Sequence, residues 1–246
     1  MKADPFVQLR LLDLQALDSA LDRLAHKRKT LPALAEIDRR DGLVAARHGD
    51  VVLAEATVSD LQRELDKAEA DIEQVRVRRA RDEDRLGSGA ITVPKQLEEL
   101  QHEVATLSKR QSDLEDAELE VMERMEEAQK SLDGLLGERT DNETARAAAV
   151  VERDAGWAEI DAETTRTQAE RAAVATEIPA DLLALYEKIR AAEGGLGAGP
   201  IERGRCGACR LDLMQNEKAE YRAAPVDEVL RHECRRILVR TPESGL

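Results

Sequence analysis

Two runs of apolar residues, spaced alternately three and four positions apart, limit this chain to a narrow set of folds. The first run is Val51, Ala54, Val58, Leu61, Leu65, Ala68, Ile72 and Val75, and the second is Leu97, Leu100, Val104, Leu107, Leu114, Val121, Met125, Ala128, Leu132 and Leu135. This spacing is typical of the seam of a left-handed coiled coil. Gln111 and Glu118 fall on the second seam, where polar residues usually set the register of pairing.

The segment between the two runs contains the residues that stop one helix and start another. Gly87, Gly89 and Pro94 lie there, and proline is well suited to the first turn of a helix. Folding the chain about residue 92 brings Pro5 opposite Pro179, so the two arms are nearly equal in length. We therefore predict a mostly α protein in which residues 1–178 form a long antiparallel coiled-coil hairpin with its turn at about 87–94.

Two features of the arms predict departures from straight helices. Pro32 lacks a backbone donor and should kink or break the first arm. Gly42 and Gly49 follow, and folding the chain back places Gly134 and Gly137 almost opposite Gly49, which suggests a hinge near 42–49 and 134–137. The alternative is that these glycines are simply tolerated, each at a cost of about 1 kcal/mol.

Composition and charge exclude several classes of partner for the helical part. Charged residues make up 36% of the chain and aromatic residues 2%, which suits long helices that bury a narrow stripe. From residue 200 on there are nine Lys or Arg and eight Asp or Glu, so residues 1–199 carry 28 against 43. Such a polyanion disfavours binding of nucleic acid or an acidic membrane along the hairpin. No apolar stretch resembles a signal peptide or a membrane span, so we expect a cytoplasmic protein without a membrane partner.

The three cysteines and one of the four histidines form a metal-binding pattern near the end of the chain. Cys206 and Cys209 have the spacing of a metal-binding knuckle, and His232 and Cys234 supply a second close pair of donors. Four protein ligands of this kind fill a tetrahedral Zn²⁺ site, so we expect structural zinc rather than a catalytic ion. Two alternatives remain: Cys206 and Cys209 as a redox dithiol, or His232 as a bystander with water or another residue completing the site.

The region around the cysteines predicts a small second domain. Residues 179–199 are expected to form a short helix and a glycine-rich linker, and residues 200–246 a zinc ribbon with a helical turn at 216–221 and a strand at 236–240. A domain of this size with so few aromatic residues buries little surface. Zinc binding should therefore supply most of its folding free energy.

Three classes of function follow from these features. The first is a non-enzymatic adaptor or chaperone-like protein that engages a protein partner through the hairpin, with a candidate docking point at its tip: Arg76, Arg78, Arg79, Arg81, Arg85, Ile91 and Val93. The alternative at the tip is an ordinary solvated helix face, because acidic residues interleave with the arginines.

The second class is binding of RNA or DNA through the arginines of the zinc ribbon, which are Arg203, Arg205, Arg210, Arg222, Arg231, Arg235, Arg236 and Arg240. Such binding should be weak and should fall steeply with salt. The third class, an enzyme acting on a small-molecule substrate, is disfavoured, because no phosphate-binding loop or catalytic set of residues is visible. The oligomeric state does not follow from the sequence.

The chain resembles a bacterial family of coiled-coil proteins that end in a C4-type zinc ribbon and that include an actinobacterial branch. The residues that carry the resemblance are the segment 94–103 after the turn, the first knuckle at 205–211 and the segment 231–240 around the second knuckle. The family pattern ends in Cys-x-x-Cys; here Cys234 matches the last cysteine and Arg231 occupies the position of the missing one. The resemblance implies a non-enzymatic adaptor, and some relatives look like nucleic-acid binders or chaperone-like partners of transcription and motility factors.

Overall fold

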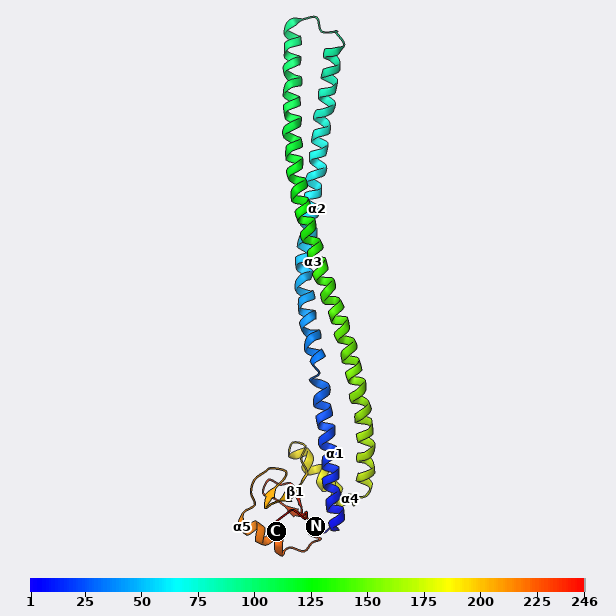
Figure 1. Ribbon diagram of the computed structural model, residues 1–246, viewed down its shortest axis with the longest axis vertical. Helices are drawn as coiled ribbons and strands as arrows, with labels where there is room; N and C mark the ends of the chain where they lie inside the picture. Colours follow the sequence, from blue (N-terminus) through cyan, green and yellow to red (C-terminus); the bar gives the residue numbers. More distant parts are fainter. Residues whose placement is uncertain (246) are drawn as a thin grey trace. The chain divides into compact units, whose positions relative to one another are not determined.

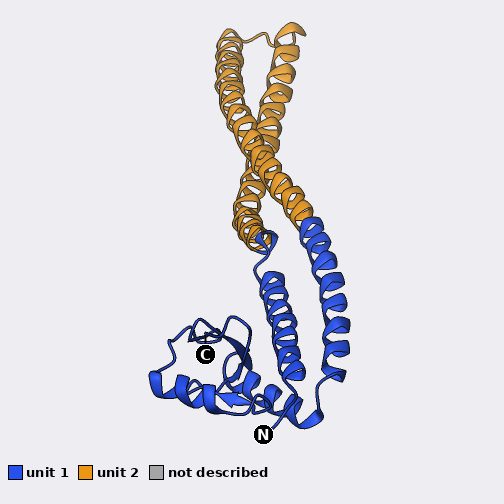
Figure 2. Ribbon diagram, turned by 60° about the horizontal axis from the view of Figure 1, so that its bottom comes forward, with its two compact units in different colours: residues 1–34, 150–246 blue, residues 35–149 orange. Residues whose placement is uncertain are grey.

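The computed structural model describes residues 1–245 and is mostly helical, as predicted (Figure 1). Its elements in chain order are α1 (Pro5–Lys29), α2 (Pro32–Gly87), α3 (Pro94–Thr176), α4 (Ala180–Ala192), β1 (Ala198–Glu202), β2 (Arg205–Cys206), α5 (Gln215–Ala223), β3 (Leu230–Arg231) and β4 (Ile237–Val239). The chain divides into two compact units (Figure 2). Unit 1 combines residues 1–34 with 150–246, and unit 2 is residues 35–149.

Unit 2 is an antiparallel helical hairpin built from the parts of α2 and α3 that carry the two predicted seams (Figure 1). Gly87 ends α2 and Pro94 begins α3, so the predicted turn is confirmed. Residues of the predicted seams are buried or half-buried, while most of their neighbours are exposed. Ion pairs join Arg47 to Glu138 and Arg124 to Glu64 across the two helices. The heptad pattern therefore located the contact face of both helices correctly.

The four glycines of the predicted hinge lie inside unbroken helices. Both α2 and α3 continue through 42–49 and 134–137 as regular α-helix. A Cβ atom added at Gly42, Gly49, Gly134 or Gly137 would meet no other group within 4 Å. Packing therefore does not require glycine at these positions, and the hinge stays a prediction.

In unit 1, the first arm breaks where the proline predicted it. α1 ends at Lys29, and Pro32 is the first residue of α2. Thr30 closes α1 by donating backbone and side-chain hydrogen bonds to the His26 carbonyl. Trp157 of α3 donates its indole N–H to the Arg28 carbonyl at 3.1 Å, so α3 satisfies another of the free carbonyls at the end of α1.

A four-stranded sheet in the order β2-β1-β4-β3 organises the C-terminal part of unit 1. β1 pairs parallel with β4 and antiparallel with β2, and β3 pairs antiparallel with β4. Side chains alternate between the faces of a strand. In β4, Ile237 and Val239 point to one face and Leu238 to the other, and all three are fully buried.

Each face of the sheet has its own core. The helix-side core consists of Leu11, Leu14, Ile178, Leu182, Tyr186, Ile189, Ala198, Val229, Ile237 and Val239. The knuckle-side core consists of Ile201, Cys206, Leu213, Tyr221, Leu230 and Leu238. The cysteine pattern therefore lies on one face of the sheet, and α1 and α4 cover the other.

α1 packs on two neighbours: the alanine-rich end of α3, whose Val174 and Ala175 lie against the helix-side core, and the core residues of α4 and β4. Leu11 and Leu14 are fully buried in the helix-side core with α4 and β4, whereas Phe6 is 79% exposed. Asp18 of α1 accepts hydrogen bonds from Arg171 of α3 at 2.6 Å and from the Tyr186 hydroxyl of α4 at 2.7 Å. Because Asp18 is only 1% exposed, this network ties the three helices together in the interior.

The glycine-rich segment after α4 is an ordered turn, in contrast to the expected linker. Gly194 and Gly195 adopt φ values of +69° and +90°, a region that favours glycine. A Cβ at Gly197 would lie 2.8 Å from the Tyr186 ring, so the backbone there packs directly on α4. Ala198 already belongs to β1 and is buried. The compact units thus divide the chain differently from boundaries at 178 and 199, because α1, α4 and the sheet share one core.

Candidate metal centre

The first knuckle forms where β2 ends. The Cys206 N–H donates to the Leu211 carbonyl at 2.9 Å, and the Arg210 N–H donates to the Cys206 carbonyl at 2.7 Å. Arg210 closes the turn with a φ of +65°, in the left-handed region. A Cβ at Gly207 would lie 2.8 Å from the Pro200 ring, so this turn also needs a glycine next to Cys206. The local backbone thereby turns Cys209 back toward Cys206.

The second knuckle repeats this hydrogen-bond pattern with one residue fewer. The His232 N–H donates to the Arg236 carbonyl at 3.1 Å, and the Arg235 N–H donates to the His232 carbonyl at 2.8 Å. Arg235 has a φ of +67°, nearly the same as Arg210. His232 is therefore the structural counterpart of Cys206, whereas the sequence pattern had placed Arg231 at that position. A longer imidazole side chain replaces a thiol in a shorter turn.

The two knuckles bring the four predicted donors together. Donor atoms of Cys206, Cys209, His232 and Cys234 all lie within 4.8 Å of one another. The sulfurs of Cys206 and Cys234 are 3.9 Å apart, and Cys209 Sγ is 3.5 Å from His232 Nδ1. A tetrahedral zinc ion with ordinary bond lengths would separate two sulfurs by about 3.8 Å and a sulfur from an imidazole nitrogen by about 3.5 Å. The donor set and its spacing therefore fit a four-coordinate metal ion.

Burial and hydrogen bonding affect the thiols in different ways. Burial raises the pKa of the Cys206 thiol to about 12. Burial also acts to raise the pKa of Cys209, but hydrogen bonds from the Leu211 N–H and from the other two cysteines outweigh it and lower that pKa. Metals bind the thiolate form, so metal binding at this cluster has to release the proton of Cys206.

An acidic residue that the sequence analysis did not single out faces the histidine. Glu217 of α5 is buried, and its Oε1 lies 3.8 Å from His232 Nε2, the ring nitrogen opposite to the one facing Cys209. Its Oε2 accepts the Met214 N–H at 2.8 Å, which fixes the carboxylate at the start of α5. A carboxylate behind a metal-binding histidine orients the ring and selects its tautomer. Glutamate in the first turn of a predicted helix was the available sequence signal.

The eight predicted nucleic-acid-binding arginines fall into two groups. Arg205 pairs with Asp212, while Arg231, Arg236 and Arg240 donate to backbone carbonyls within unit 1. Within residues 1–245, no side-chain hydrogen bond or ion pair is made by the other four, which are exposed: Arg203, Arg210, Arg222 and Arg235. Sequence alone could not separate the arginines that hold the fold from those that face solvent.

The predicted tip residues lie around the turn of unit 2. Every arginine of this set has a carboxylate within ion-pair distance, for example Arg78 with Glu103 and Arg85 with Asp82. Val93 is 47% exposed, and Ile91 shares a shallow pocket with Arg85. The interleaved acidic residues therefore neutralise much of the positive charge at the tip.

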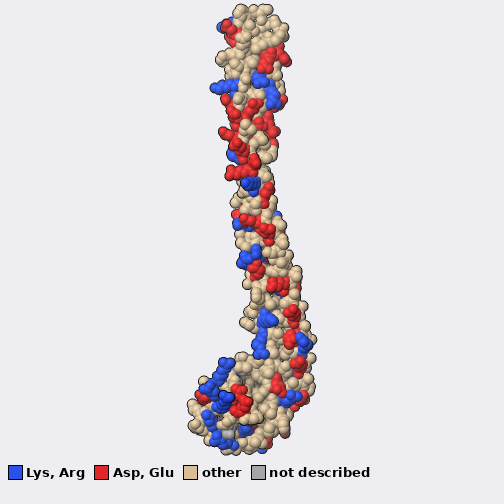
Figure 3. Space-filling model, viewed as in Figure 1, with Lys and Arg blue, Asp and Glu red and all other residues tan. Residues whose placement is uncertain are grey.

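No helix within residues 1–245 is both long enough and apolar enough to cross a membrane. This agrees with the charge density of the arms, whose surfaces are lined with ionised side chains (Figure 3).

Comparison with known proteins places the chain in a family. The family model described as the CT398-like coiled coil hairpin domain matches residues 14–194. An uncharacterized protein of Mycobacterium tuberculosis, Rv2229c, is 39% identical over 245 residues, which cover 98% of each chain. A Mycobacterium leprae protein, ML1638, is 32% identical over 93% of this chain and 94% of its own length.

Solved structures agree with this placement. A structure from Mycobacterium smegmatis has a TM-score of 0.85 at 36% identity and covers 98% of this chain and 100% of its own. CT398 from Chlamydia trachomatis has a TM-score of 0.66 at 19% identity, covering 96% and 98% of the two chains, and so shares the fold. With the hairpin, the turn and the C-terminal Cys/His cluster in place, this chain belongs to the CT398-like coiled-coil hairpin family and has mycobacterial homologues.

Proposed function

We propose that this protein is a non-enzymatic, cytoplasmic adaptor that holds a protein partner on its coiled-coil hairpin and whose C-terminal sheet is stabilised by structural zinc. The observation that carries the adaptor role is the surface of unit 2. The two helices bury mainly the side chains of their seam. Several large apolar side chains outside the seam are exposed to solvent, among them Leu53, Val77, Leu119 and Met122. Leu119 and Met122 lie three residues apart on one face of α3, and a contiguous exposed apolar patch of this kind is typical of a site that binds another protein.

The chemistry of the Cys/His cluster supports a structural ion. Three thiols and one imidazole are a set that zinc prefers, and four protein donors leave no position open for a substrate or a water molecule. The matched family is one of coiled-coil proteins, which supports a role without catalysis.

Metal content tests the zinc part of the proposal. Elemental analysis and native mass spectrometry of the purified chain should give one zinc per chain. Cys206→Ser and His232→Ala should each lower that occupancy. Because serine is similar in size to cysteine, Cys206→Ser removes the sulfur ligand with little change in packing. Full zinc occupancy in His232→Ala would show that the imidazole is not a ligand.

Site-specific photocrosslinking tests the adaptor part. The full-length, zinc-loaded protein would carry p-benzoylphenylalanine at Leu53 of the hairpin or, in a second sample, at Arg222 of α5; both positions are exposed. After irradiation in the cytosol of the source cell, we expect the Leu53 sample to give a discrete adduct that protease removes and nuclease does not. An adduct only at Arg222, sensitive to nuclease, would contradict the adaptor role.

The second candidate function is binding of RNA or DNA, and it depends on four residues. Arg203, Arg210, Arg222 and Arg235 are exposed and free of internal ion pairs within residues 1–245, so they could contact phosphates. Binding should then weaken steeply between low and moderate salt, because each phosphate contact releases counterions. An affinity that does not change with salt would exclude this candidate.

A further inference from the structure

We propose that a groove between α2 and α3 of unit 2 is the docking site for a basic amphipathic helix of a partner protein. The docking groove is defined by Leu65 of α2 and by Leu119, Met122 and Met125 of α3. The proposal rests on the adaptor role given above and deepens it by naming the surface and the chemistry of the partner.

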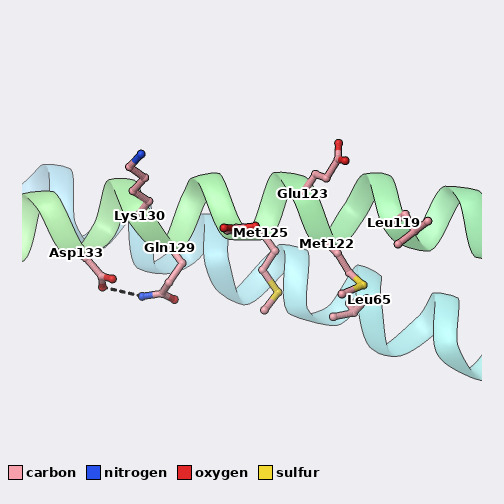
Figure 4. Close-up of a pocket in the computed structure, with 9 residues that line it drawn as sticks. Leu65, Leu119, Met122, Glu123, Met125, Gln129, Lys130 and Asp133 are labelled. Atoms are coloured by element: carbon pink, nitrogen blue, oxygen red, sulfur yellow. Dashed lines mark hydrogen bonds between the residues drawn. The ribbon is translucent and has the colours of Figure 1, made fainter.

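The groove is apolar and open to solvent. It encloses about 700 Å³, and Leu119 and Met122 remain 56% and 48% exposed. Figure 4 shows the side chains of Met122 and Met125 directed toward α2, with Glu123 and Lys130 directed away from it. Methionine adapts its shape to an incoming apolar surface more readily than branched side chains do.

Two of the apolar residues of the groove make no part of the seam that joins α2 and α3. Leu65 and Met125 belong to the predicted seams, whereas Leu119 and Met122 lie outside them and still carry large apolar side chains. Residues in such flanking positions become buried when a third helix packs against a helical pair. The part of α3 that lines the groove from Leu119 to Gln129 is about 15 Å long, which matches about three turns of a docked helix.

Charge decides which kind of helix fits. Residues 55–75 and 115–135, which form the hairpin on both sides of the groove, contain 15 Asp or Glu and four Lys or Arg. Carboxylates of Glu123, Glu126 and Asp133 border the groove, with Lys130 as the one basic residue there. Acidic side chains also gather on the face of the hairpin seen in Figure 3. A partner helix with Lys or Arg beside its apolar stripe complements this field, whereas the same acidic face of a second copy is repelled by it.

A synthetic peptide serves as the probe. It is an 18-residue helix with Leu at intervals of three and four and Lys on both flanks. One control peptide has the same composition with its Leu residues distributed around the helix, and another has Glu in place of Lys. The chain has four methionines, so ¹³C-methyl-methionine NMR of the full-length protein gives two reporters in the groove, Met122 and Met125, and two outside it, Met1 and Met214.

We expect the amphipathic basic peptide alone to shift the Met122 and Met125 signals and to leave those of Met1 and Met214 unchanged. The double variant Leu119→Ser/Met122→Ser should weaken binding about tenfold or more, measured by fluorescence anisotropy. The matched control Leu43→Ser/Val52→Ser removes two exposed apolar side chains of the same hairpin outside the groove and should bind as the parent does. Circular dichroism melting confirms that both variants fold.

Three outcomes would overturn the proposal. Equal binding of the two basic peptides would mean that the polyanionic hairpin attracts any cation. Equal loss of binding in both double variants would mean that the groove has no special role. Shifts of Met122 and Met125 that depend on protein concentration without peptide, together with a dimer mass in sedimentation, would mean that a second copy covers the groove.

Failure of this proposal is distinguishable from failure of the adaptor role. If photocrosslinking at Leu53 yields a protein adduct that Leu119→Ser/Met122→Ser does not reduce, the adaptor role stands and the groove is not its docking site. If no hairpin position yields a protein adduct, the adaptor role itself fails.

Discussion

Removal of the metal should unfold one of the two cores of unit 1 and leave the other folded. The Cys/His cluster lies on the knuckle side of the sheet, and Cys206 is itself part of the knuckle-side core. No donor of the cluster belongs to the helix-side core. Chelation, or the variant Cys206→Ser, therefore acts on one face of the sheet.

The expected magnitude follows from what each core buries. Besides Cys206, the knuckle-side core has five apolar side chains, each contributing about 1.5–3 kcal/mol, or roughly 7–15 kcal/mol together. Zinc binding in small zinc peptides supplies about 10–16 kcal/mol. The ion thus contributes about as much as the whole apolar content of this core. The helix-side core has ten buried residues and is joined to the buried Asp18 network. Removal of the metal leaves both in place, because no metal ligand belongs to this core.

The two tyrosines of the chain make the experiment selective. Tyr186 lies in the helix-side core and Tyr221 in the knuckle-side core. In the full-length protein labelled with 3-fluorotyrosine, ¹⁹F NMR gives one signal from each. On titration with a chelator, the Tyr221 signal should move to the position of an exposed tyrosine, while the Tyr186 signal and the helical circular dichroism persist.

The control variant acts on the opposite face. Leu14→Ala removes a fully buried side chain of the helix-side core and should lower stability by about 2–5 kcal/mol, with the first effect on Tyr186. Loss of both tyrosine signals at the same chelator concentration would refute the reasoning, because it would show that the two faces of the sheet unfold as one unit. An unchanged Tyr221 signal would refute it as well.

Three further predictions concern single side chains. Glu217→Gln should weaken zinc affinity by about 10–100-fold in a competition assay with a chromophoric chelator, because the carboxylate that faces His232 is lost; unchanged affinity would show that Glu217 does not orient the ring. Asp18→Ala should lower the free energy of unfolding in urea by about 3–5 kcal/mol, since it leaves buried partners unpaired, and a loss below 1 kcal/mol would contradict this. Gly134→Ala and Gly137→Ala should each stabilise α3 by about 1 kcal/mol in thermal melts, and a destabilised variant would indicate that the helix bends there in solution.

The spacing of the Cys and His residues predicts part of the metal cluster, but not all of it. Cys206-x-x-Cys209 predicted a knuckle, and His232-x-Cys234 predicted its complement, because each pair is a short loop whose geometry depends on adjacent residues. The structure brings the four donors together as predicted. It also equates His232 with Cys206 through backbone hydrogen bonds, and it adds Glu217 behind the ring. The position of Glu217 depends on how α5 packs against the second knuckle, which the spacing of the ligands does not specify.

The hairpin can be predicted from the amino-acid sequence because a seam is a local property. A repeat of three and four places apolar residues on one face of a helix wherever that helix lies. The turn at 87–94 and the break before Pro32 followed from residues that stop or start helices in any context. The surface that covers the C-terminal sheet is set by long-range packing, which no local pattern predicts. Leu11 and Leu14 lie beside the end of α3, as a helical hairpin alone would allow, but their burial also depends on α4 and β4, more than 160 residues away along the chain.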